Sequence, residues 1–202
     1  MRLGILGGTF DPIHLGHLLL AEVSRDRLGL QRVLFAPAGD PPHKQDQSIT
    51  PAYHRQAMVE LAAAAHPNFD VSPVDLERPG PHYSVDTVRL IRARFDLPAE
   101  DCYFLIGADS LEDLPRWRRP GELVRLCRLA VAHRPGHQPD LTRLVGQIPG
   151  IAGRLDWVEM PALGISASDI RARVRAGQSI RYQVPAEVQA YIQTHRLYGA
   201  VS

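Results

Sequence analysis

Short apolar runs alternate with helix-like segments along the 202 residues of the chain, and this alternation restricts the fold more than any other feature. Runs typical of strands lie at Arg2–Leu6, Arg32–Ala36, Asp101–Ile106 and Arg128–Ala132, with a further candidate at Leu155–Met160. Strands separated by helices favour a parallel sheet that is covered on both faces. We therefore predict an α/β fold, a Rossmann-like, doubly wound and mostly parallel sheet.

Segments with helical spacing lie between and after these runs, at Leu15–Leu28, Pro51–Ala65, Ser84–Phe95, Ser166–Ala176 and Pro185–His195. We expect Thr50 to cap the second of these helices and Ser84 to cap the third. Their apolar stripes are Met58, Leu61, Ala62 and Ala65 in the second, and Val85, Val88, Ile91 and Phe95 in the third. The last two helices predict a small helical C-terminal appendage, residues 161–202, packed on a Rossmann-like core of residues 1–160 within one domain overall.

Composition narrows the class of protein further. Lysine plus arginine number 23 and aspartate plus glutamate 22, so the net charge of +1 indicates no broad nucleic-acid-binding surface. No apolar run approaches the roughly 18 residues that span a membrane, and the N-terminus lacks the apolar core of a signal peptide. The two cysteines, Cys102 and Cys127, have neither zinc nor disulfide spacing. We expect a cytoplasmic protein with no membrane partner and both thiols buried.

The segment after the first predicted strand, residues 7–17, reads GGTFDPIHLGH. Two glycines allow a tight turn and a close approach to a ligand, and the helix that follows presents free amides and its positive end. His14 and His17 are three residues apart and share a face of the first turn, so they suit a phosphate. A glycine turn alone is common, and two histidines could bind a metal, although two ligands rarely hold zinc. The segment matches neither GxGxxG nor a P-loop.

A second candidate anion site lies late in the chain, where residues 165–171 read ISASDIR. Ser166 or Ser168 would cap a helix, and Arg171 would lie in its first turn. The simpler interpretation is an ordinary helix cap with a solvated arginine.

Further candidate residues follow other predicted strands. The loop PAGDPPHK, residues 37–44, would direct His43 and Lys44, the only lysine of the chain, towards the ligand. The amides that follow Tyr83 in HYSVDT could receive a carboxylate. Asp109 in IGADS could accept from ribose hydroxyls or lie near a metal ion. Trp117 could stack on a flat ring. A rigid surface loop, simple capping and a packing tryptophan are the structural alternatives.

Taken together and in this order, these segments resemble the bacterial nicotinate-mononucleotide adenylyltransferase family of the HxGH nucleotidylyltransferase superfamily. The resemblance runs from Leu3 to about Tyr198 and includes GGTFDPIHLGH, PPHK, YSVDT, IGADS, Trp117, HRPG and ISASDIR. Two departures are minor: Ala167 replaces a usual serine, and Ser84 replaces a frequent threonine.

The resemblance implies an enzyme that transfers the adenylyl group of ATP to nicotinate mononucleotide by direct in-line attack, giving deamido-NAD and pyrophosphate. It implies that His14, His17 and Arg171 are catalytic. It implies ATP binding by Gly8, Thr9, Phe10, His17, Gly107, Asp109, Ile165, Ser168 and Arg171. It implies mononucleotide binding by Lys44, Ser84, Trp117 and Arg134. We expect Mg²⁺ to arrive with ATP, without a dedicated protein site.

Three alternatives remain open at this point. Pantetheine-phosphate adenylyltransferase shares the FDPxHxGH start, but its chains are typically shorter and lack YSxDT and the tryptophan. A dehydrogenase would use the same sheet but would need GxGxxG and an acidic residue about 20 positions later. A non-catalytic nucleotide-binding regulator could lose His17 or Arg171, and this chain has both. The sequence leaves the oligomeric state open.

Overall fold

A computed structural model describes residues 1–41, 49–133 and 140–199 of the chain. It contains a six-stranded sheet in the order β3-β2-β1-β4-β5-β6, and every neighbouring pair is parallel. The strands are β1 (Leu3–Gly8), β2 (Arg32–Pro37), β3 (Phe69–Val71), β4 (Cys102–Gly107), β5 (Arg128–His133) and β6 (Leu155–Glu159). The predicted doubly wound fold class is confirmed, and all its strands are parallel.

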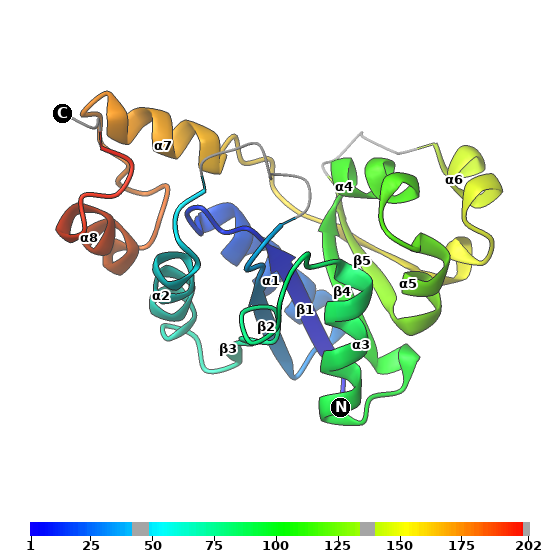
Figure 1. Cartoon of the computed structure of the whole chain (residues 1–202). Coiled ribbons are helices and arrows are strands. Elements are labelled where there is room, and N and C mark those ends of the chain that lie inside the picture. Colours follow the sequence, from blue (N-terminus) through cyan, green and yellow to red (C-terminus); the bar gives the residue numbers. More distant parts are fainter. Residues whose placement is uncertain (42–48, 134–139, 200–202) are drawn as a thin grey trace.

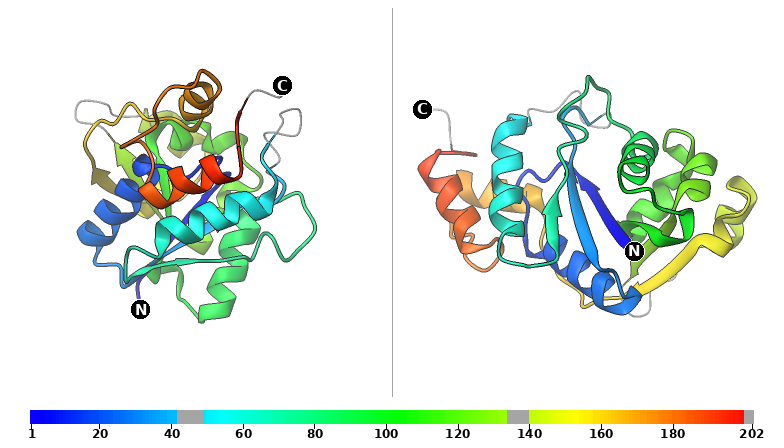
Figure 2. Two further views of the ribbon diagram at one scale, coloured as in Figure 1. Left: turned by 90° about the vertical axis from the view of Figure 1, so that its left-hand side faces the viewer. Right: turned by 90° about the horizontal axis from the view of Figure 1, so that it is seen from below.

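Helices cover both faces of this sheet (Figures 1 and 2). One face packs against α1 (Leu15–Leu28), α2 (Ala52–Ala63), α7 (Ala167–Arg175) and α8 (Ala186–Thr194). The other face packs against α3 (Ser84–Phe95), α4 (Ala108–Asp113), α5 (Pro120–Leu126) and α6 (Leu141–Gln147). Neighbouring β1 residues divide between the two cores: Ile5 joins the second group and Leu6 the first. This is the alternation that a strand buried on both faces requires.

Several element boundaries differ from the sequence predictions. Thr50 does not cap α2: the N-cap is Pro51, the helix starts at Ala52, and the Thr50 amide instead donates to the Asp11 carboxylate at 3.2 Å. Ser84 is the first helical residue of α3 rather than its cap, and the N-cap is Tyr83. The α2 helix ends at Ala63, so Ala65 lies beyond it and is exposed.

The shortest elements were not predicted. They are β3, the helices α4, α5 and α6, and the 3₁₀ turns η2 (Ala99–Asp101), η3 (Leu114–Arg116) and η4 (Ile151–Arg154). The three helices span about two turns at most, and β3 has only three residues, which is shorter than the stretch of about 4–8 residues over which alternation is recognised. The apolar stripe predicted for α3 is confirmed: Val85, Val88 and Ile91 are buried, and Phe95 packs against the same core.

The last two helices pack on the same core as α1 and α2. Ile170 of α7, together with Val188 and Ile192 of α8, is fully buried in that core. Tyr198, which follows α8, donates from its hydroxyl to the Asp11 carboxylate at 2.8 Å. The end of the described chain is thereby tied to the loop after β1.

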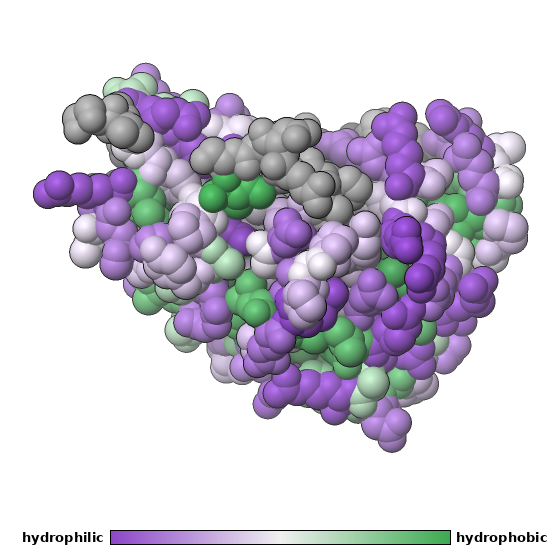
Figure 3. Space-filling view, in the orientation of Figure 1, coloured by the Kyte–Doolittle hydropathy of each residue, from purple (hydrophilic) through white to green (hydrophobic). Residues whose placement is uncertain are grey.

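The order of strands reverses direction between β1 and β4, and this is the point where doubly wound sheets bind ligands. The amino-terminus lies at the amino-terminal end of the strands, and the segments that leave β1 and β4 lie at the carboxyl end (Figure 1). The visible surface carries hydrophobic side chains only in separate small patches (Figure 3). No described helix is long and apolar enough to cross a membrane. Both cysteines are free and buried, as predicted.

Candidate active site

The turn after β1 brings an aromatic ring under the first turn of α1. Phe10 has a φ of 50°, in the left-handed region, and its side chain is 2% exposed. A Cβ atom at position 8 would lie 3.0 Å from the Phe10 ring, so this close packing requires Gly8. The ring meets the edge of the His17 imidazole at a centroid distance of 5.0 Å. Phe10 therefore supports His17 from below.

His14 and His17 form a stacked pair at the start of α1. Their ring centroids are 3.7 Å apart, with an interplanar angle of 23°. A Cβ atom at position 16 would lie 3.0 Å from His14 Nδ1, so the glycine between the histidines leaves room for the His14 ring. The His14 backbone amide donates to His17 Nδ1 at 3.3 Å. Because Nδ1 accepts this bond, the neutral His17 ring carries its proton on Nε2.

His14 differs from His17 in burial. Its side chain is 8% exposed, and its Nδ1 atom is buried without a hydrogen-bond partner among the described residues. Burial lowers the pKa of the His14 imidazole to about 4, because desolvation penalises the charged form. His14 is therefore neutral at pH 7 and can act as a neutral donor or acceptor.

The late motif lies beside this turn. Ser166 caps α7, and its hydroxyl accepts from the Asp169 amide at 3.1 Å. The Ser168 hydroxyl is 2.9 Å from that of Ser166. Arg171 of α7 donates from Nη1 to the Asp11 carbonyl at 2.6 Å. Residues 160 apart in sequence thus meet at the loop that precedes the two histidines.

A first cavity of about 320 Å³ opens between the carboxyl ends of β1 and β4 and the start of α3. Gly8, Thr9, His17 and Gly107 form one side. Ser84 and Trp117 line the cavity from the side of α3 and η3, together with Tyr83 and Arg118. The Trp117 ring is half-buried and meets Phe104 edge-on at 6.2 Å. A flat apolar surface therefore faces a helix start that offers amides.

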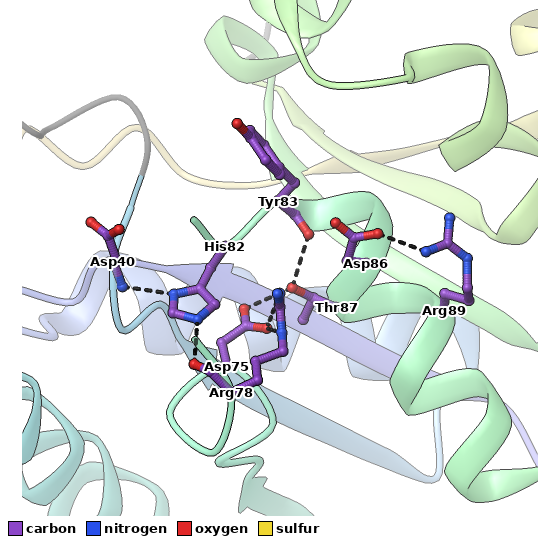
Figure 4. Close-up of polar contacts among 8 residues, drawn as sticks. All are labelled: Asp40, Asp75, Arg78, His82, Tyr83, Asp86, Thr87 and Arg89. Carbon is purple, nitrogen blue, oxygen red and sulfur yellow. Dashed lines mark hydrogen bonds and ion pairs between the residues drawn. The ribbon is translucent and has the colours of Figure 1, made fainter. Parts of the chain in front are cut away.

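The floor of this first cavity is a hydrogen-bonded network (Figure 4). Asp75 is buried, and its carboxylate accepts from the Thr87 hydroxyl and from Arg78, at 2.7 Å in each case. His82 accepts at Nδ1 from the Asp40 amide at 2.7 Å, and its Nε2 lies 3.0 Å from the Arg78 carbonyl. The buried His82 imidazole thus links the Asp40 amide to the Arg78 carbonyl. These hydrogen bonds fix the floor of the cavity.

A second cavity, of about 750 Å³, adjoins the first. The residues His17, Leu20 and Gly107 line both cavities, so they form the boundary between them. Asp109 and Ile165 line the second cavity, as do His14, His133 and the irregular segment that contains Met160 and Leu163. The two cavities therefore meet at His17.

The structure brings together most of the residues selected from the sequence. His17, Gly8, Thr9, Gly107, Asp109, Ile165, Ser84 and Trp117 line one or both cavities, and His14 lines the second. Phe10 is buried beneath His17, while Ser168 and Arg171 lie on α7 next to the Asp11 loop. Lys44, His43 and Arg134 lie outside the described residues.

The sequence analysis missed Arg55, Asp75 and His82. Arg55 is 1% exposed and donates to four backbone carbonyls around the site. Its position was readable: it precedes Met58 by three residues and Ala62 by seven, so it lies on the apolar stripe predicted for α2. A charged residue on a buried stripe is a signal in itself.

The comparisons with known proteins agree with this geometry. The model of the cytidylyltransferase-like family matches residues 5–173. A relative from Thermomicrobium roseum, named "Probable nicotinate-nucleotide adenylyltransferase", is 50% identical, with 99% of this chain and 92% of the relative covered. A Roseiflexus relative of the same name is 47% identical, with 97% of each chain covered. The chain belongs to the nicotinate-nucleotide adenylyltransferase family.

Solved structures support the fold of this nicotinate-nucleotide adenylyltransferase family member. The nicotinic acid mononucleotide adenylyltransferase of Plasmodium falciparum, complexed with NaAD, has a TM-score of 0.77 and 20% identity. The comparison covers 98% of this chain and 97% of that one. The predicted family and the enzyme class, a nucleotidyltransferase, are confirmed. The pantetheine-phosphate, dehydrogenase and regulator alternatives are therefore set aside.

Proposed function

We propose that this chain transfers the adenylyl group of ATP to nicotinate mononucleotide, forming nicotinic acid adenine dinucleotide and pyrophosphate. The observation that carries the proposal is the pair of cavities that meet at His17, Leu20 and Gly107. An in-line displacement needs the attacking oxygen and the leaving pyrophosphate on opposite sides of one phosphorus atom, so the mononucleotide phosphate must meet the α-phosphate of ATP where the two cavities join. A phosphate oxygen of the mononucleotide bonds to the α-phosphorus of ATP, and the bond to the β-phosphate oxygen breaks.

The first cavity suits the mononucleotide. Trp117 offers a ring face for a pyridine, and the first amides of α3, beginning at Ser84, have no carbonyl within the helix to bond. Arg118 adds a positive charge at this wall, where its guanidinium carbon lies 5.4 Å above the Tyr83 ring centroid. Apolar contact and unpaired amide donors are the two features that a pyridine carboxylate requires.

The second cavity suits ATP, because it is larger and opens towards the late motif. Asp109 is exposed at its edge, where a carboxylate can accept from ribose hydroxyls. Gly107 allows the ligand to approach the end of β4, and Ile165 contributes an apolar contact. Arg171, one turn after the start of α7, reaches the Asp11 loop and can serve the phosphates, and Ser168 lies in the first turn of the same helix. Thr9, which lines the first cavity, belongs to the same loop as Asp11.

Catalysis in this proposal is positioning and charge stabilisation. His17, fixed by the His14 amide, the His14 ring and Phe10, donates from Nε2 to a phosphoryl oxygen as charge develops. The positive end of the α1 dipole and the Arg171 guanidinium add positive charge near the same oxygens. No residue needs to form a covalent intermediate.

We infer that Mg²⁺ enters with ATP and neutralises phosphate charge. Among the described residues there is no group of three or more histidine, cysteine, aspartate or glutamate side chains that could hold a metal. Mg²⁺ usually keeps several waters and binds largely through substrate phosphates, so ATP can carry the ion without a dedicated protein site.

A pyrophosphate-release assay tests the proposal. Purified protein with ATP and Mg²⁺ receives nicotinate mononucleotide, nicotinamide mononucleotide or phosphopantetheine in parallel. We expect the highest kcat/KM with nicotinate mononucleotide and no release with phosphopantetheine. A preference for phosphopantetheine, or no release with any acceptor from protein of native circular dichroism, would contradict it.

A further inference from the structure

Arg55 is a fully buried charge directly behind the candidate site. It lies in the first turn of α2 and is 1% exposed. Burial lowers the pKa of its guanidinium, whereas the Asp11 carboxylate acts on it in the opposite direction. Within the described residues Arg55 forms no ion pair, so its charge is balanced by backbone dipoles and by Asp11 at longer range.

All three kinds of nitrogen in the side chain donate to main-chain carbonyls. Nη1 donates to Thr9 and to Ala38, at 2.7 Å in each case. Nη2 donates to Gly39 at 3.1 Å, and Nε donates to Thr50 at 2.8 Å. One planar group therefore connects the turn after β1, the turn after β2 and Thr50, two residues before α2 begins.

These three segments are parts of the site. Gly8 and Thr9 line the first cavity, and so does Ala38. The Ala38 amide also donates to the Gly8 carbonyl at 2.9 Å, and the Thr50 amide donates to the Asp11 carboxylate at 3.2 Å. Arg55 thus fixes the separation of the two turns that face the reacting phosphates.

A buried charge is an expensive way to stabilise a fold, because apolar residues of similar volume are often neutral or better. A buried guanidinium at this position is better explained by a need to hold the two turns in a defined geometry. Lysine could not replace it, because a single ammonium nitrogen cannot reach carbonyls that surround a planar fork.

We propose that Arg55 is a positioning residue for adenylyl transfer: it sets the Thr9 turn and the Ala38–Gly39 turn in the arrangement that the two substrates need. The inference rests on the proposed function, and it adds a residue that touches neither substrate. A displacement of about 1 Å at such a site can cost about 10²-fold in rate.

The test compares Arg55→Met, Arg55→Lys and Arg55→Ala with a control of matched stability. Ile151→Ala serves as the control, because Ile151 is fully buried in η4, which precedes β6 and so lies at the opposite edge of the sheet. Assays are run well below the Tm of each variant. We expect kcat/KM to fall about 10²-fold in Arg55→Met and at least about tenfold in Arg55→Lys, with Ile151→Ala within about twofold of wild type.

Two further readouts separate positioning from stability. Added guanidinium at millimolar concentration should restore part of the activity of Arg55→Ala and should not raise the activity of Ile151→Ala. Hydrogen exchange should show lost protection at the Ala38 amide in Arg55→Met and normal protection there in Ile151→Ala. If wild type itself releases no pyrophosphate, the proposed function fails, and exchange at Ala38 alone decides the role of Arg55. Wild-type kcat/KM in Arg55→Met, or unchanged Ala38 protection, would overturn the inference.

Discussion

The two cavities that share His17 differ in how firmly their walls are held. The first is walled by buried and hydrogen-bonded groups, among them Asp75, His82 and Thr87. The second is larger and is lined by the irregular segment that contains Met160 and Leu163, with exposed Asp109 at its edge. A preformed wall can select among small rings, whereas an open one suits a large ligand that brings its own charges. Selectivity should therefore reside in the first cavity.

Replacing His17, on the boundary between the cavities, should have the largest effect. His17→Ala removes a donor to phosphoryl oxygens that gain charge in the transition state, and one such donor is worth about 10²–10³ in kcat. Steady-state kinetics and far-UV circular dichroism should be measured together. His66→Ala, at a half-buried histidine stacked on Phe69, is the control. Near-normal kcat with an intact fold would remove His17 from the chemistry.

His14 should make stability depend on pH. Its pKa is about 4 in the folded state and about 6.5 when unfolded, so the unfolded chain binds the proton more tightly. The contribution is fully present above pH 6.5 and is lost as the pH falls towards 4, by about 3 kcal/mol. Urea unfolding at pH 7, 5.5 and 4.5 should show a shallower decline for His14→Asn. Parallel declines for both proteins would exclude His14 as the cause.

Arg171→Lys should weaken the binding of ATP and lower kcat/KM, although the side chain itself lines neither cavity. The guanidinium can hold one phosphate oxygen pair while it stays near the Asp11 carbonyl, but an ammonium acts as a point charge. Loss of one hydrogen bond to a charged group costs about 1.5–3 kcal/mol, so KM for ATP should rise about tenfold or more. Arg173→Lys, on the same helix and bonded to the Ser179 carbonyl, is the matched control. Equal ATP kinetics in both variants would make Arg171 a structural residue.

The part of the site formed by residues close together in the sequence was predicted well. The glycine turn and the histidines at positions 14 and 17 act through neighbours within ten residues, so their pattern is visible in one line of sequence. Four of the six strands, β1, β2, β4 and β5, were visible because each is mostly a run of buried residues, whereas β6, with only Val158 buried, was visible as a short apolar segment. The three-residue β3 and the short helices α4–α6 carry too little periodicity to be recognised.

The non-local half could not be predicted in the same way. Arg55 reaches Thr9 across 46 positions, and Arg171 reaches Asp11 across 160. Such contacts depend on how α2 and α7 pack, which no local pattern states. His82 and Asp40 meet across 42 positions for the same reason. What the sequence offered for Arg55 was only its place on an apolar stripe.

The acid form of the mononucleotide should be preferred at the first cavity. The amides at the start of α3 and the Arg118 guanidinium favour a carboxylate. The N–H₂ group of a carboxamide would instead face these hydrogen-bond donors of the protein. An unpaired buried donor costs about 1–3 kcal/mol, so kcat/KM for nicotinate mononucleotide should exceed that for nicotinamide mononucleotide by about tenfold or more. Equal values would show that the carboxylate site lies elsewhere.

Trp117→Ala should give the smallest of these effects and separates the cavities most directly. The ring lines the first cavity and is held edge-on by Phe104, so it can stack on a pyridine without a change of rotamer. Aromatic stacking contributes about 0.5–1.5 kcal/mol and does not depend on the charge of the ring substituent. KM should therefore rise several-fold for both mononucleotides, and their ratio and the KM for ATP should stay near wild type. Tyr53→Ala, at a tyrosine of α2 that is 66% exposed and lines neither cavity, is the control and should change neither KM. An effect of Trp117→Ala confined to ATP would place adenine, and not pyridine, in the first cavity and would reverse the assignment of both substrates.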